Sequence, residues 1–214
     1  RYIKAIFMGG DWLGLSSLYC DLLFFKKDKR IEEVLDILEQ NLKPVYTRTD
    51  HPLPRNLIAL LIDFRTPATD QKIRDYEQVY ASLPVSDRPP WGIVLARYLS
   101  FHGKYDRALS LFKELHPAMA HLSRYHIAQE TCHLEKAKGM TGEARKEEFV
   151  LSFQGIKTSL EKDAFFVHDH LTWSKAKEIV KSLADAGVLA LAYEALDWLL
   201  KKAGGGSRLV EEKI

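Results

Sequence analysis

The chain has 214 residues, with 31 Lys and Arg against 29 Asp and Glu, a formal net charge of +2, and 46% hydrophobic residues. This composition is that of an ordinary globular chain, and it excludes whole-chain disorder, a collagen-like repeat and a disulfide scaffold. The length allows one elongated domain or two small ones. A net charge so close to zero gives no argument for nucleic-acid binding by itself.

The two cysteines, Cys20 and Cys132, lie far apart, and neither belongs to a CxxC or zinc-ligand spacing. Isolated cysteines are typical of a reducing compartment, so we expect an intracellular location, either the cytoplasm or the mitochondrial matrix. No apolar run approaches the roughly 20 residues that span a bilayer, so we expect no membrane insertion.

Apolar residues at three- and four-residue steps predict four helices in the first part of the chain. In chain order these are residues 11–26, 31–42, 55–64 and 70–83. Pro44 is expected to close the second helix, because proline cannot continue the helical hydrogen bonds. Pro84 and the Pro89-Pro90 pair are expected to form the next break.

The same periodicity predicts further helices, and residues 162–171 alone are ambiguous. The expected helices are residues 91–101, 105–115, 122–138, 141–160, 173–186 and 188–202. No stretch combines strict alternation with β-branched residues and hairpin turns, so strands are not expected.

These elements group into about five helix-turn-helix pairs, and such pairs stack when each covers the apolar flank of the next. We therefore predict an all-α fold, an α-solenoid of about five pairs forming one helical-repeat domain over residues 1–203. A bundle around one central core is the alternative. Residues 204–214 begin with Gly-Gly-Gly-Ser, which is typical of a flexible linker, and we expect a linker and tail there.

The helix pair at residues 91–115 carries the most specific pattern in the chain. It has small residues where two helices approach closely, a glycine in the turn, and large residues that fill the space between helices. These residues are Ala96, Ala108, Gly103, Tyr105, Phe112 and Leu115. The pattern resembles the tetratricopeptide repeat and also the pentatricopeptide repeat.

Two later segments echo this pattern to different extents. Gly187 and Ala192 repeat the turn glycine and the small helix residue in the last pair. A further echo begins at Gly139 but fails afterwards, because Glu147 and Glu148 stand at apolar positions of the pattern.

The richest cluster of possible metal ligands is on the helix expected at 122–138. His126, Glu130 and His133 fall on one helical face, and the last two have the Glu-x-x-His spacing of carboxylate-bridged metal sites. Such sites need a second motif of this kind, which the sequence lacks, so we expect no metal and no cofactor. We also find no phosphate-binding loop and no nucleophile elbow, and we therefore expect no enzymatic activity.

A stack of helix pairs exposes a concave surface lined by the first helix of each pair, and such surfaces bind a peptide or a partner helix. We therefore expect a protein-interaction scaffold or adaptor. The residues expected to be exposed for the partner are Arg97, Ser100, Phe101, Arg124, Gln129, Lys175 and Lys177. In a permanent subunit of a larger assembly, Phe165 and Phe166 would be interface residues; otherwise they pack between the last two pairs.

The alternative function follows from the pentatricopeptide resemblance, which implies an organellar RNA-binding factor. In that family one repeat reads one base with two or three side chains. The residues that would contact phosphates are Arg97, Lys104, Arg107, Arg124 and the lysines of Lys175–Lys181. Such binding would weaken steeply as salt increases.

Overall fold

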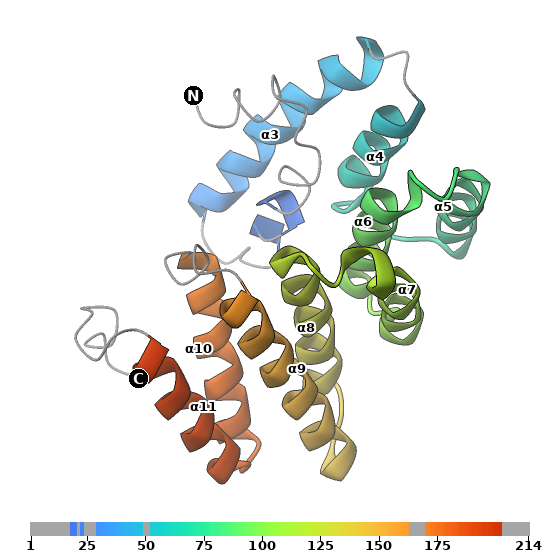
Figure 1. The fold of residues 1–214 in the computed structure, drawn as a ribbon. Coiled ribbons are helices and arrows are strands. Elements are labelled where there is room, and N and C mark those ends of the chain that lie inside the picture. The colour runs from blue at the N-terminus through green and yellow to red at the C-terminus, as the bar shows by residue number, and fades with distance from the viewer. Residues whose placement is uncertain (1–17, 21, 24–28, 49–51, 163–169, 203–214) are drawn as a thin grey trace. The chain divides into compact units, whose positions relative to one another are not determined.

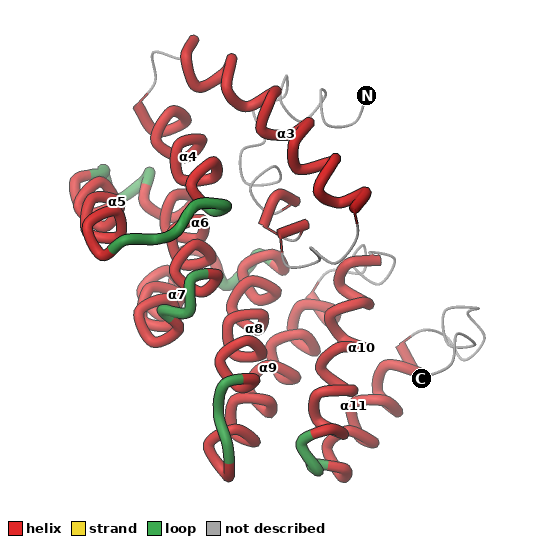
Figure 2. The backbone as a smooth tube through the Cα atoms, turned by 180° about the vertical axis from the view of Figure 1, so that it is seen from behind, coloured by secondary structure: helices red, strands yellow, loops and turns green. Residues whose placement is uncertain are grey.

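A computed structural model of the chain describes residues 18–20, 22–23, 29–48, 52–162 and 170–202. Every regular element in these ranges is an α-helix, and none of the described residues forms a strand (Figure 1, Figure 2), so the all-α prediction is confirmed. The chain divides into two compact units, Arg1–Met119 and Ala120–Ile214, and each is described by itself.

Some expectations lie wholly or mostly outside the described residues. Of the helix expected at 11–26, only residues 18–20 and 22–23 are described, and both stretches are helical. The pair Phe165 and Phe166 and the tail 204–214 are outside the described ranges altogether.

The first unit is built around one enclosed helix. Its helices are α3 (Lys29–Arg48), α4 (Pro52–Asp63), α5 (Asp70–Ser82), α6 (Arg88–Phe101) and α7 (Tyr105–Met119). α3 packs on α4, whereas α4, α5 and α7 all pack on α6 (Figure 1). Every residue from Trp91 to Ser100 in α6 is buried, because this helix carries apolar residues all around its axis. The expected pairing of α4 with α5 is therefore replaced by the packing of both on α6.

Prolines end fewer helices than the sequence suggested. The prediction that Pro44 closes a helix is wrong, since α3 continues through it to Arg48, and α7 likewise contains Pro117. A proline inside a helix removes one backbone hydrogen bond and its ring crowds the preceding turn. Pro89 and Pro90 lie in the first turn of α6, where the missing N–H groups have no partner in the helix anyway.

Aromatic rings form much of the core of the first unit. The Phe64 ring is fully buried and meets the rings of Tyr98 and Phe101 edge-on, at centroid distances of 5.3 and 5.8 Å. Tyr76 from α5 contacts both Tyr98 and Trp91 of α6. These ring contacts connect the end of α4 and the face of α5 to the enclosed helix.

The turn between α6 and α7 closes the pair that carries the repeat pattern. Gly103 has a φ of +74°, a conformation that residues with a Cβ rarely adopt. The Lys104 N–H donates to the carbonyl of Leu99 at 2.8 Å, and the Gly103 N–H donates to that of Ser100 at 3.0 Å. This pair of bonds is a Schellman motif, which satisfies the last carbonyls of α6.

The residues expected to pack this pair are buried as predicted. Ala96, Ala108 and Phe112 have no exposed surface, and Leu115 is also buried. Tyr105 is half-buried at the start of α7. Burial of these side chains lets α6 and α7 approach closely.

The second unit contains two packed helix pairs. Its helices are α8 (Ser123–Lys138), α9 (Gly142–Lys162), α10 (His170–Asp185) and α11 (Leu189–Lys202). α8 packs on α9 and α10 on α11, and further contacts between α9 and α10 join the pairs (Figure 1). The core between these helices includes Leu134, Phe149, Phe153, Ile156, Ile179, Leu183 and Leu199. The last two expected pairs are therefore confirmed as packed hairpins.

The α10–α11 turn repeats the α6–α7 turn bond for bond. Gly187 has a φ of +75° and donates to the carbonyl of Ala184 at 2.9 Å, while Val188 donates to that of Leu183 at 2.9 Å. Ala192, which follows the turn at the predicted spacing, is buried. The turns after α6 and α10 therefore share one backbone conformation.

Candidate functional site

The residues predicted to contact a partner differ widely in exposure. Arg97 and Ser100 are 4% and 3% exposed, so the expectation that they line an open surface is wrong. Their helix, α6, is enclosed by neighbouring helices and leaves no free face between Trp91 and Ser100. Phe101, at the end of the same helix, is half-buried and contacts Phe64.

The other four candidates are in the second unit. Lys177 is exposed on α10, and Gln129 is half-buried on α8. Arg124 and Lys175 belong to α8 and α10, but their side chains are outside the described set. Gln129 is the candidate that the structure places in a hollow of the surface.

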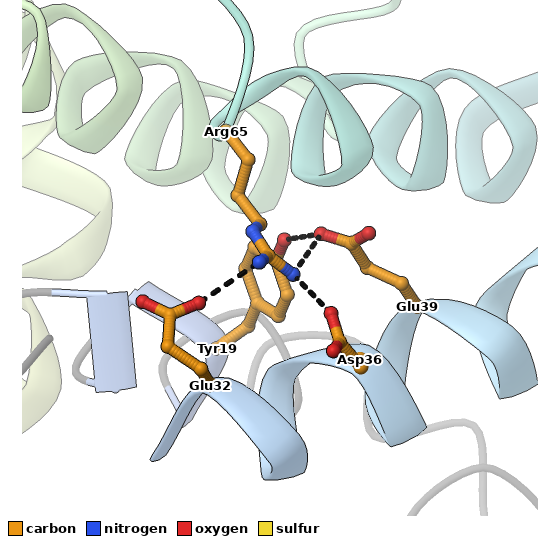
Figure 3. Close-up of polar contacts among 5 residues, drawn as sticks. All are labelled: Tyr19, Glu32, Asp36, Glu39 and Arg65. Atoms are coloured by element: carbon orange, nitrogen blue, oxygen red, sulfur yellow. Dashed lines mark hydrogen bonds and ion pairs between the residues drawn. The ribbon is translucent and has the colours of Figure 1, made fainter. Parts of the chain in front are cut away.

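The first unit contains a charge cluster that the sequence reasoning did not single out (Figure 3). Arg65, just after α4, points at one face of α3, with Nη2 2.8 Å from Oε2 of Glu32 and Nη1 2.8 Å from Oδ1 of Asp36. Nη1 is also 3.4 Å from Oε1 of Glu39, and that oxygen accepts a 2.5 Å hydrogen bond from Tyr19.

This cluster ties the segment that follows α4 to α3. The hydrogen bond with Asp36 is the main cause that raises the pKa of Arg65, while burial and the bond to Glu39 raise the pKa of Tyr19. Both side chains therefore keep their protons at neutral pH, and the guanidinium is already engaged by carboxylates. The spacing of the acidic residues along one face of α3 was the signal that could have revealed the cluster.

The second unit carries an open recess between α8 and α9, which we call the α8–α9 recess. Its volume is about 180 Å³. One face of each helix contributes to it, at the three- and four-residue steps that place side chains on one side. The lining residues are His126, Gln129, Glu130, His133, Leu151, Gln154, Gly155 and Thr158.

His133 is held at the recess by a buried carboxylate. Its Nδ1 lies 2.5 Å from Oε2 of Glu148, and Nζ of Lys136 lies 2.6 Å from the other oxygen. Although partial burial opposes ionisation, the bonds to His133 and Lys136 hold the pKa of Glu148 below its usual value. Because an ionised carboxylate can only accept, Nδ1 of His133 donates to it, and in the neutral ring Nε2 keeps the lone pair.

The remaining walls of the recess are also fixed by hydrogen bonds. Nε2 of His126 lies 2.9 Å from the carbonyl of Ala120, so this nitrogen carries the proton. Ser152 donates to the backbone carbonyl of Glu130 at 2.9 Å, which ties α9 to α8. A Cβ at Gly155 would lie 3.1 Å from Oε2 of Glu130, so the glycine makes room for that carboxylate.

The burial of the Glu148 side chain was not predicted from the sequence. Glu148 stands where the repeat pattern calls for an apolar residue, and we interpreted it as the point where the pattern fails. The side chain is in fact buried, at 8% exposure, because His133 and Lys136 supply its charge partners. A charged residue at a core position of a repeat is the signal that could have predicted an ion pair there.

The residues that the sequence analysis considered as metal ligands lie in the α8–α9 recess. His126, Glu130 and His133 share the recess, but no group of three or more His, Cys, Asp or Glu among the described residues could hold a metal ion. Cys20 and Cys132 are both buried. Nor is any helix in the described ranges long and apolar enough to cross a membrane.

Comparison with known proteins gives no family assignment. No protein-family model, no curated protein and no solved structure matches the chain.

Proposed function

We propose that the chain is a non-catalytic helical-repeat scaffold that binds another protein, either as an adaptor or as a subunit of a larger assembly. The observation that carries this proposal is the α8–α9 recess, an open hollow on a packed helix pair to which polar and apolar surface both contribute. Within the second unit, the packed pairs α8–α9 and α10–α11 supply the frame for such a surface, as in proteins built from stacked hairpins.

The charged side chains of the described residues favour a protein partner over RNA. Two of the cations expected to contact phosphates are engaged in ion pairs, Arg107 with Glu77 and Lys104 with Asp70. The Lys138 ammonium lies between two carboxylates, of Glu135 and Glu178, at 2.7 and 2.6 Å. Each such pair lowers the positive potential that RNA binding requires.

The test is affinity capture with the full chain from its native source, with and without nuclease, followed by reconstitution from purified components. We expect a protein that survives nuclease treatment and binds the purified chain with a fixed stoichiometry. Recovery of RNA without a stable protein partner would contradict the proposal.

The alternative, an organellar RNA-binding factor, is separated from the scaffold by the salt dependence of binding. Filter binding of labelled single-stranded RNA at two salt concentrations measures it directly. An RNA-binding factor that neutralises several phosphates loses affinity steeply with salt, whereas we expect no saturable RNA binding at either concentration.

A further inference from the structure

The size of the α8–α9 recess restricts what it can hold. At about 180 Å³ it is several times larger than the roughly 30 Å³ that one water molecule occupies in the liquid. It is smaller than the roughly 300–1,000 Å³ of sites that hold drug-sized molecules or cofactors. The recess therefore fits a group of the size of a single amino-acid side chain.

Hydrogen-bond acceptors dominate the fixed polar groups of the recess. His133 turns its protonated Nδ1 to Glu148, and among the described residues nothing hydrogen-bonds to its Nε2. The Thr158 hydroxyl donates its proton to the carbonyl of Gln154 at 2.9 Å, which leaves only its oxygen lone pairs for a ligand. The carboxamides of Gln129 and Gln154 can each add a carbonyl oxygen.

The charges around the recess favour a cation. The Glu130 carboxylate belongs to the wall, and the Glu148 carboxylate lies directly behind His133. Lys136 offsets one of these charges, and neither lysine nor arginine is among the described residues that line the recess. At the rim, Leu151 is 46% exposed and offers an apolar surface to an aliphatic stem.

We propose that the α8–α9 recess binds the guanidinium of an arginine side chain presented by a partner protein. This inference rests on the proposed scaffold function and names the site and the chemistry of the contact. A guanidinium carries five N–H donors in a plane and stays protonated at all physiological pH values, so it can satisfy acceptors on both helices at once. Its three-carbon stem would lie against Leu151.

The direct test is an NMR titration of the full chain with N-acetyl-arginine amide, observing the ring resonances of His133. N-acetyl-citrulline amide is the matched control, because it has nearly the same shape but a neutral urea in place of the guanidinium. We expect a saturable shift of the His133 resonances with the arginine probe and binding at least about tenfold weaker with citrulline. Equal binding of the two probes, or no saturable shift, would overturn the proposal.

Two variants locate the binding in the recess. Gln154→Leu changes an exposed side chain and Thr158→Val removes an acceptor, and circular dichroism checks that each variant keeps the fold. Gln71→Leu, on exposed α5 surface, is the control. We expect both recess variants to weaken the arginine probe about fivefold or more and the control to bind like the parent. Unchanged binding in both recess variants would refute the assignment.

The same variants separate this inference from the scaffold function. If a captured partner binds the parent, Gln154→Leu and Thr158→Val equally well, the scaffold function stands and the arginine site is wrong. If the arginine probe binds but no stable protein partner is recovered, the site stands and the scaffold function fails.

Discussion

Replacing Gly103 with alanine isolates the contribution of one backbone conformation to stability. The glycine has a φ of +74°, and no atom lies within 4 Å of the position that a Cβ would take. Alanine would therefore create no clash, and its cost comes from the left-handed conformation alone, about 1–2 kcal/mol. Gly187, with a φ of +75° and the same open surroundings, should lose the same amount in the other unit.

Gly139 is the matched control, because it also follows a helix but has an ordinary φ of −89°. A Cβ there would meet only the Lys136 carbonyl, at 3.7 Å, an ordinary contact. Gly139→Ala should thus leave stability unchanged or raise it by about 0.4–1 kcal/mol, since alanine restricts the unfolded chain.

Urea unfolding followed by circular dichroism measures these differences. With a denaturant slope of about 2 kcal/mol/M, Gly103→Ala and Gly187→Ala should each lower the transition midpoint by about 0.5–1 M. Equal losses for all three substitutions would refute the reasoning, because they would show that helix-end glycines matter here irrespective of their φ.

Five other substitutions test charged and polar contacts of the two units. The pKa of Glu148 is lowered in the folded state, so its stabilising contribution is present above the usual carboxyl pKa and disappears as the pH falls through the folded pKa. The difference in unfolding free energy between the parent and Glu148→Gln should therefore close on acidification. Urea midpoints measured across pH check this. Arg65→Met should cost about 1–2 kcal/mol, whereas Lys201→Met, which breaks an exposed pair, should change the unfolding free energy by less than about 0.5 kcal/mol. Burial raises the pKa of Tyr98 to about 12, and its hydroxyl has no hydrogen-bond partner among the described residues, so Tyr98→Phe should leave the thermal unfolding midpoint unchanged or raise it. Tyr76→Phe should lower the midpoint, because the Tyr76 hydroxyl donates to Asp63.

Much of the fold could be predicted from local sequence patterns. Helices α7, α8, α9 and α11 begin close to their predicted starts, because an apolar stripe and a preceding turn signal mark each of them. The glycines of the α6–α7 and α10–α11 turns were predictable since few other residues adopt a positive φ. Pro44 misled the prediction, because the local rule does not include the tertiary contacts that hold a helix through a proline.

The candidate site was only partly predictable. Gln129 was singled out from its helix face, but Gln154 and Thr158 were not, because their meeting with α8 depends on how two helices cross. The exposure of Arg97 was predicted by analogy with a first helix of a repeat pair, although the apolar residues on every side of α6 already indicated an enclosed helix. Periodicity predicts helices well, and it predicts the contacts between them poorly.

The enclosure of α6 has a consequence for the chain during synthesis. α4 and α5 leave the ribosome before α6, but α7 leaves after it, and α7 contributes the most extensive packing on that helix. A nascent chain that has emerged from the ribosome only as far as Phe101 therefore displays apolar side chains that only a later segment can cover. Ribosome-bound chains arrested at that length should recruit holdase chaperones, and release of another twenty residues or so should free them.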